Sequence, residues 1–114
     1  MKNFLISILA LSSVLHAQDL IEIPVADILR TDFDVIFEID TEDTYSKVTL
    51  DCQSFLHGIN IYDDNDRNLL QFYLYEPECH DVLNFIWNRK DEGKQSCIRL
   101  DLEKSGYELL ESCD

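Results

Sequence analysis

Cysteine is the residue type with the clearest chemical potential in this sequence, which contains Cys52, Cys79, Cys97 and Cys113. No Cys-x-x-Cys pair is present, and the spacings of 27, 18 and 16 residues fit no zinc module. In an exported chain of this size, four cysteines most simply form two disulfides. Sequence alone permits three pairings. A predicted hairpin at the C-terminus favours Cys97–Cys113, which leaves Cys52–Cys79.

Other catalytic chemistry has little support in the sequence. His57 is predicted in a turn and His80 near a helix start, where both serve as exposed polar residues. The 23 acidic residues make some carboxylate pair inevitable, so no chosen pair indicates a glycosidase. Turns and a helix end require Gly58, Gly93 and Gly106, which leaves no glycine-rich loop for a phosphate group. We therefore expect neither an enzyme nor a cofactor.

Asp64, Asp66 and Asn68 place oxygen ligands at alternate positions, as calcium-binding loops do. The helix-loop-helix calcium motif would require a glycine where Leu69 stands and a bidentate glutamate where Tyr75 stands. Predicted strands, rather than helices, flank this loop. We interpret the segment as the solvated tip of a hairpin, with weak calcium binding as the alternative.

Three tyrosines and two amides share the predicted outer face of the same hairpin. They are Tyr62, Tyr73, Tyr75, Asn60 and Gln71. Tyrosine rings supply rigid contact area and amides supply hydrogen bonds, a combination typical of protein- and sugar-binding faces. The sequence therefore predicts a binding face. The alternative is that the following helix covers these rings, which would then belong to the core periphery.

Alternating apolar and polar residues predict the strands that position these side chains. Residues 33–39 alternate and indicate a half-buried strand. A second strand is predicted over residues 48–56, with Cys52 on its inward face. Residues 20–25 indicate a further strand, which Pro24 confines to the edge of a sheet because proline has no N–H to donate.

The hairpin that carries the tyrosines is predicted to join residues 59–62 to residues 69–75. Its predicted register places an apolar residue at every inward position. It also sets an aromatic ring beside a glycine, where the ring can cover the missing side chain. The predicted pairs are Ile61 with Leu70, Ile59 with Phe72, and Tyr73 with Gly58.

A helix over residues 77–92 and a final hairpin complete the predicted elements. Pro77 suits the first helical turn, and Gly93 offers a left-handed stop. The apolar stripe of the helix consists of Cys79, Val82, Leu83 and Ile86. The hairpin joins residues 95–102 to 107–113 through a three-residue loop that ends in Gly106. Its predicted pairs are Leu100 with Leu110, Arg99 with Glu111, and Cys97 with Cys113.

The first 17 residues have the features of a cleaved secretory signal peptide, with Lys2, an apolar segment and Ala17 at the cleavage site. The apolar segment, about 12 residues long, is shorter than the roughly 20 that a membrane span needs, and no later segment is apolar enough. We expect residues 18–114 to form a single domain that is secreted or periplasmic. After cleavage we expect no insertion into a membrane.

Charge narrows the class of partner. Removal of Lys2 with the leader leaves eight basic and 23 acidic residues, a net charge of −15 over residues 18–114. This charge opposes nucleic acids and anionic lipids, which bind basic patches. It favours encounter with a basic partner. The alternative explanation of the charge is solubility in a crowded extracellular or periplasmic space.

These observations predict a mainly β fold: a small antiparallel β-sandwich or curled sheet of about seven strands, one packed helix and two disulfides. A two-layer α+β fold, with the helix as the whole second layer, is the alternative. We expect a non-catalytic binding or inhibitory module that engages a protein partner outside the cytoplasm. The alternative function is a structural or assembly component that pairs through a sheet edge such as residues 20–25.

Overall fold

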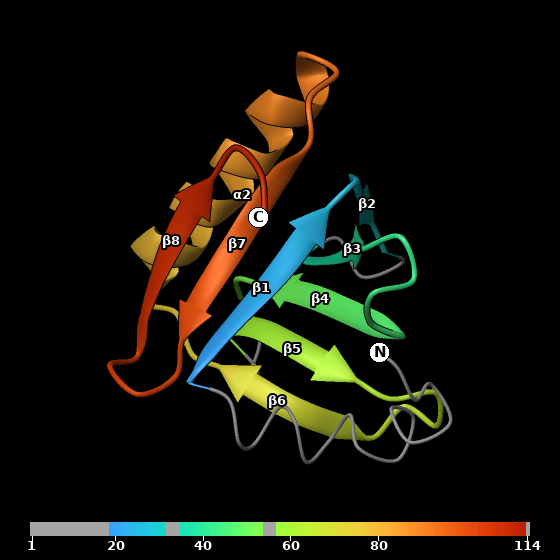
Figure 1. Cartoon of the computed structure of the whole chain (residues 1–114), viewed down its shortest axis with the longest axis vertical. Coiled ribbons are helices and arrows are strands. Elements are labelled where there is room, and N and C mark those ends of the chain that lie inside the picture. The colour runs from blue at the N-terminus through green and yellow to red at the C-terminus, as the bar shows by residue number, and fades with distance from the viewer. Residues whose placement is uncertain (1–18, 32–34, 54–56, 114) are drawn as a thin grey trace.

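The structure, a computed structural model, describes residues 19–31, 35–53 and 57–113, so the predicted leader lies outside the described residues. Within them, eight strands form two antiparallel sheets, accompanied by one helix (Figure 1). The five-stranded sheet has the order β2 (Asp27–Arg30), β3 (Ile36–Asp40), β4 (Lys47–Asp51), β5 (Gly58–Tyr62) and β6 (Asn68–Phe72). The three-stranded sheet has the order β1 (Leu20–Val25), β7 (Ser96–Asp101) and β8 (Gly106–Leu110). The expected mainly β class is confirmed.

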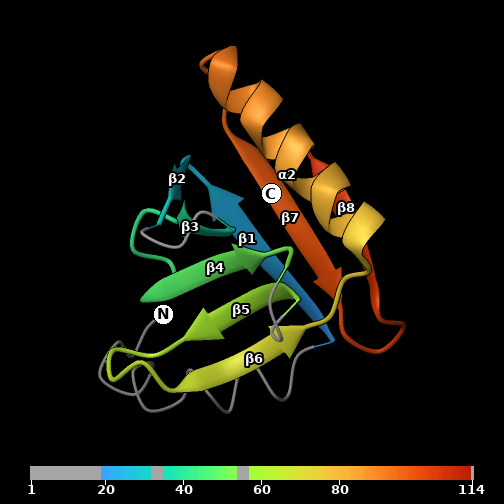
Figure 2. The ribbon, with the colours of Figure 1, turned by 180° about the vertical axis from the view of Figure 1, so that it is seen from behind.

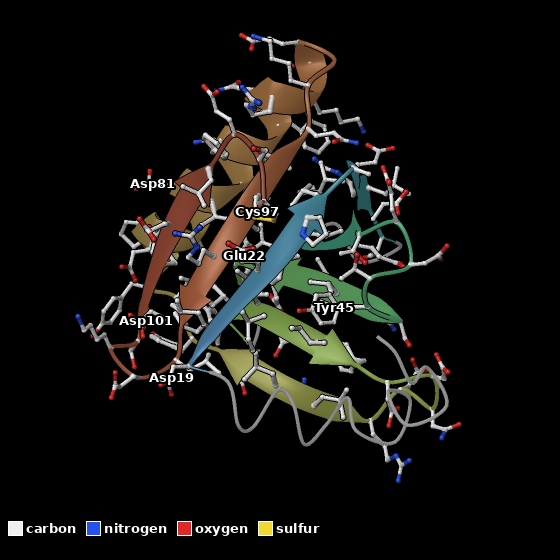
Figure 3. The ribbon with its side chains drawn as sticks, in the orientation of Figure 1. Asp19, Glu22, Tyr45, Asp81, Cys97 and Asp101 are labelled. Atoms are coloured by element: carbon white, nitrogen blue, oxygen red, sulfur yellow. A yellow bond between two sulfur atoms is a disulfide. The ribbon has the colours of Figure 1, made fainter. Side chains whose placement is uncertain are left out.

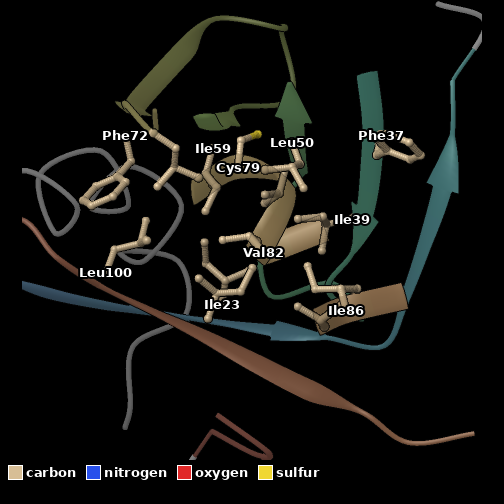
Figure 4. Close-up of a cluster of buried hydrophobic side chains, with 14 of the residues drawn as sticks. Ile23, Phe37, Ile39, Leu50, Ile59, Phe72, Cys79, Val82, Ile86 and Leu100 are labelled. Atoms are coloured by element: carbon tan, nitrogen blue, oxygen red, sulfur yellow. The ribbon is translucent and has the colours of Figure 1, made fainter. Parts of the chain in front are cut away.

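The helix α2 (Glu76–Asp91) and the two sheets enclose one hydrophobic core. Figure 2 shows α2 lying along β7 and β8. Ile23 of β1, Leu50 of β4 and Val82 of α2 converge with their neighbours in this core (Figure 4). Because β1, β7 and β8 supply a second sheet, the alternative with the helix as the whole second layer is wrong.

Strand alternation places the side chains of β3 and β1 as the sequence indicates. Phe37 and Ile39 are buried, whereas Glu38 between them is exposed. Residues 32–34, at the start of the predicted strand, lie outside the described residues. β1 is an edge strand of its sheet, in agreement with the position of Pro24.

The β5–β6 hairpin has the predicted register, with Ile61 opposite Leu70 and Ile59 opposite Phe72. β6 ends at Phe72 instead of residue 75. Gly58 has φ +118°, and a Cβ there would collide with the carbonyl oxygen of Phe72. The glycine is therefore required by a close approach of backbone. The Tyr73 ring stacks on the ring of His57, the residue before Gly58.

The helix has the predicted apolar stripe and ends. Cys79, Val82 and Ile86 are buried. The Glu78 carboxylate accepts a 3.0 Å hydrogen bond from the backbone N–H of Tyr75, which caps the helix start. Gly93, with φ +71°, follows the last turn as the sequence predicts.

The register of the C-terminal hairpin differs from the prediction by three residues. Arg99 lies opposite Glu108 instead of Glu111, and the other two predicted pairs are displaced in the same way: Leu100 lies opposite Tyr107, and Cys97 opposite Leu110. The reason is that the turn begins earlier: Asp101 pairs with Gly106, so residues 102–105 form the turn instead of the predicted 104–106. The Asp101 carboxylate accepts hydrogen bonds from two turn N–H groups, and Ser105, with φ 56°, takes the left-handed position predicted for Gly106.

Both disulfides nevertheless form as predicted. Cys52 is bonded to Cys79 with the Cα atoms 5.5 Å apart, and Cys97 is bonded to Cys113 with the Cα atoms 5.2 Å apart. β8 ends at Leu110, so the short segment after it returns Cys113 to Cys97. The first bridge ties β4 to the start of α2, and the second closes the C-terminal end on β7.

Candidate functional site

The most exposed aromatic side chains of the described residues lie between β6 and α2. Tyr73 and Tyr75 are 58% and 65% exposed, and their ring centroids lie 5.4 Å apart in an edge-on arrangement. The Tyr73 ring also stacks on the His57 ring, with centroids 6.3 Å apart. We call His57, Tyr73 and Tyr75 the tyrosine cluster. Because the rings pack against one another, this contact surface is already ordered. Binding of a partner would therefore cost little conformational entropy at these side chains.

A surface groove adjoins the tyrosine cluster. It runs along β6 to the turn between β7 and β8, and Figure 2 shows these two elements converging. Among the residues that line it are Leu70, Phe72, Leu102, Tyr73, Tyr75 and Glu78. The groove therefore combines aliphatic contact, aromatic faces and one carboxylate, which suits a ligand with apolar and cationic groups.

The predicted binding face is divided by the fold. Asn60 is fully buried, and it pairs with Thr49 of β4 on one side and with Gln71 of the terminal strand β6 on the other. Tyr62 lies at the other end of β5, where the Lys47 ammonium lies 5.2 Å from its ring centroid. The expectation that all five residues share one exposed face is therefore wrong, and Gln71 is the exposed amide that remains near the tyrosine cluster.

The helix does not cover the tyrosine cluster. The buried side of α2 carries Cys79, Val82 and Ile86, which enter the core. Tyr73 and Tyr75 precede the helix and remain more than half exposed. The alternative in which these rings form the core periphery is therefore wrong.

At the tip of the β5–β6 hairpin, residues 63–68, each of the three candidate calcium ligands interacts with a different group of the protein. The Asp64 carboxylate accepts a 2.5 Å hydrogen bond from Ser46, and the Asp66 carboxylate lies 3.6 Å from the Lys47 ammonium. The Asn68 amide donates to the carbonyl oxygen of Leu70 at 3.2 Å. Across residues 19–31, 35–53 and 57–113, no group of three or more histidine, cysteine or acidic side chains is arranged to hold a metal ion.

Asp63, which the sequence does not single out, organises this tip. One of its carboxylate oxygens accepts hydrogen bonds from the backbone N–H groups of Asn65 and Arg67, at 2.8 and 2.9 Å. The other accepts from the Arg67 guanidinium at 3.1 Å. The bond from the Arg67 backbone is the main reason that the pKa of Asp63 is lowered. Asp63 therefore holds the backbone of this turn together.

Acidic side chains lie on the same side of the molecule as the groove, and one of them, Glu78, lines it. Partial burial raises the pKa of Tyr107, and the nearby carboxylates of Glu78 and Asp81 raise it further. Figure 3 places Asp81 and Asp101 on the side of the molecule that holds β8 and the β7–β8 turn. The electrostatic potential on this side of the molecule is therefore negative, as is the net charge of the chain.

Basic side chains near the core are paired instead of forming a patch. Arg99 contacts Glu22 at 2.8 Å and Glu108 at 3.2 Å, one on each neighbouring strand. The hydrogen bond that Arg99 donates to the Glu22 carboxylate is the main reason that the pKa of Arg99 is raised. Sequence reasoning missed Glu22 because β1 and β7 are distant in the chain. It missed Leu102 in the groove for the same reason.

Comparison with known protein families, curated proteins and solved structures finds no match to this chain. In the part of the chain that the structure describes, α2 included, no helix has the length and apolarity needed to cross a membrane. The two disulfides indicate an oxidising, extracytoplasmic environment.

Proposed function

We propose that this protein is a small exported, non-catalytic binding or inhibitory module that engages a basic protein partner. The observation that carries the proposal is the exposed pair of Tyr73 and Tyr75, packed 5.4 Å apart beside a groove that contains Glu78. Tyrosine is among the residues most enriched where binding energy concentrates in protein interfaces.

Electrostatics supports a basic partner. The net charge of −15 over residues 18–114 attracts cationic surfaces at a distance and accelerates encounter. At contact, a guanidinium or ammonium group can lie over a tyrosine ring while its charge faces Glu78. In this proposal the net charge speeds the association of the two proteins, and the tyrosine cluster makes the direct contact.

Export is the second part of the proposal. Residues 1–17 have the composition of a secretory signal peptide. Both disulfides would be reduced in a reducing cytosol, whereas a secreted or periplasmic protein retains them. We therefore place the protein outside the cytoplasm.

The alternative role, assembly through the β1 edge, is less favoured by the geometry of that edge. Pro24 has no N–H to donate to an added strand. The carbonyl oxygen of Glu22 accepts a 3.3 Å hydrogen bond from the Tyr45 hydroxyl, so this acceptor is already occupied. An assembling chain would have to displace that bond.

The test is capture of a partner from the native exported fraction by the oxidised protein, followed by titration of that partner against single variants. Tyr73→Ala should weaken binding by about 30-fold or more, which corresponds to roughly 2 kcal/mol. Leu29→Ala is the matched control, because Leu29 is also exposed but lies at the opposite edge of the five-stranded sheet. It should leave binding unchanged.

Two further measurements distinguish a loss of binding from a loss of folding and test the role of charge. Unfolding in urea should show that Tyr73→Ala costs less than about 1 kcal/mol, as expected for a side chain that is more than half exposed. Binding of the native protein should weaken steeply between low and physiological salt, because the encounter is charge-steered. Undiminished binding by Tyr73→Ala would refute the proposed contact.

A further inference from the structure

Each of the two sheets has two terminal strands, whose outer backbone groups are available for pairing unless side chains occupy them. β2 is occupied. The Ile28 N–H donates to the Asp27 carboxylate at 2.7 Å, and the Ile28 carbonyl oxygen accepts from the Lys90 ammonium at 2.8 Å. Pro24 and the Tyr45 hydroxyl obstruct β1 in the way described above. These two edges are therefore protected against strand addition.

β6, the other terminal strand of the five-stranded sheet, is different. The Phe72 carbonyl oxygen faces Gly58 on β5. Backbone groups alternate in direction along an antiparallel strand, and the Leu74 N atom also lies beside Gly58, so the alternation continues past the end of β6. The N–H and C=O groups of Gln71 and Tyr73 therefore face away from β5. Among the described strands, none pairs with this side of β6. The tyrosine cluster and the groove lie beside it.

The two faces along this edge differ in chemistry. Tyr73, an outward residue, is on one side together with Gln71, and Tyr75 packs against its ring. Leu70 and Phe72 alternate with them and face the inner side, where Leu102 also lines the groove. An extended segment placed here would thus meet aromatic rings on one face and aliphatic side chains on the other.

We propose that β6 is a docking edge, where an extended segment of the partner adds antiparallel as a sixth strand of this sheet. Its residues alternate between basic side chains, which lie over the tyrosine rings, and apolar side chains, which face Leu70 and Leu102. This inference rests on the proposed function and specifies its binding mode. A second copy of this chain is a poor occupant, because two copies that each carry −15 repel one another.

The register of such an addition follows from the alternation. In an antiparallel pair, residues that exchange hydrogen bonds have side chains on the same face. The residues that bond to Gln71 and Tyr73 must therefore be the basic ones, above the rings. The amides of the apolar residues face away from β6 and make no bond to it.

The probe is a fluorescent octapeptide of alternating arginine and valine, together with two N-methylated forms. One form is methylated on every arginine amide and the other on every valine amide. The full-length oxidised protein should bind the parent peptide and the valine-methylated form. Methylation of the arginine amides should weaken binding by at least about tenfold, because the hydrogen bonds to β6 are lost.

Two matched controls accompany the titration. The octapeptide of alternating glutamate and valine should not bind, because its charge has the wrong sign. Hydrogen exchange should slow at the amides of Gln71 and Tyr73 when the arginine peptide binds, and should not change at Arg30, which by alternation with Ile28 faces outward on the β2 edge. Slowing at Arg30 instead would place the segment on the wrong strand.

The outcomes separate this inference from the proposed function. Equal binding of the two methylated forms, with binding still lost in Tyr73→Ala, overturns strand addition and leaves the tyrosine contact standing. Binding that survives Tyr73→Ala contradicts the proposed function itself. Absence of binding by the parent arginine–valine peptide also overturns the inference, because that peptide has the charge and alternation that the edge requires.

Discussion

The Nζ atom of Lys90 lies 2.9 Å from the Oδ1 atom of Asp27. The same ammonium donates to the Ile28 carbonyl oxygen and lies 5.2 Å from the centroid of the Trp87 ring. The last turns of α2 are thereby joined to β2, the terminal strand of the five-stranded sheet. One ion pair both fixes the helix against the sheet and occupies backbone groups that an added strand would need.

This ion pair predicts a pH-dependent contribution to stability. The hydrogen bond from Lys90 is the main cause that lowers the pKa of Asp27 from its usual 3.8, followed by the bond from the Ile28 N–H. A lowered pKa in the folded state stabilises the protein above pH 3.8, and the stabilisation disappears as pH falls through the folded-state pKa. The pair is substantially exposed, so its contribution should stay below about 1 kcal/mol.

Urea unfolding of the native protein and of Asp27→Asn would measure this contribution. The variant should be less stable at about pH 6, and the difference should vanish well below pH 3.8, where both side chains are neutral. Glu38→Gln, an exposed carboxylate on the neighbouring strand, is the control and should have little effect at either pH. A difference for Asp27→Asn that stays constant with pH would contradict the assignment.

The two disulfides should contribute unequally. Removal of the Cys52–Cys79 bridge by a double alanine substitution should destabilise the protein by roughly 3–4 kcal/mol, because it closes the longer loop. Removal of the Cys97–Cys113 bridge should cost about 0.5 kcal/mol less in the chain-entropy description. Denaturant unfolding of both double variants checks the order. A non-reducing peptide map that joins Cys52 to Cys97 would be inconsistent with both bridges.

Glycine should be essential at position 58 and replaceable at position 106. Gly58→Ala should destabilise the protein by about 2 kcal/mol or more, because φ is +118° and the new Cβ would meet the Phe72 carbonyl oxygen. Gly106→Ala has open space around the new Cβ, so its effect should be below about 1 kcal/mol. Urea titrations of both variants provide the comparison. Equal losses would show that backbone approach at Gly58 is not the cause.

Calcium should not stabilise the β5–β6 tip. Asp64 and Asp66 are directed to Ser46 and Lys47, so millimolar calcium should leave the Tm within about one degree. Asp63→Ala should lower the Tm by a few degrees in the presence or absence of calcium, because it removes the acceptor for the Asn65 and Arg67 N–H groups. A calcium-dependent rise that Asp64→Asn with Asp66→Asn abolishes would instead establish a calcium site.

The register of a hairpin could be predicted where the apolar residues of its two strands allowed only one pairing. The β5–β6 register could be predicted because few registers of so short a hairpin bury Ile59, Ile61 and Phe72 together. For the C-terminal hairpin, the predicted register was wrong because the turn was placed incorrectly. Two hydrogen bonds to Asp101 and a left-handed Ser105 place that turn at residues 102–105, whereas composition favoured Gly106 for the left-handed position.

The sequence by itself determined the inward faces of the strands and the helix with its apolar stripe. These depend on side-chain periodicity and on short separations along the chain. Only the tertiary structure decided that β1 joins β7, that Asn60 is buried, and that the β7–β8 turn meets β6 to form the groove. Such long-range placements follow from burying both sheets and the helix in one core, and no local pattern carries that information.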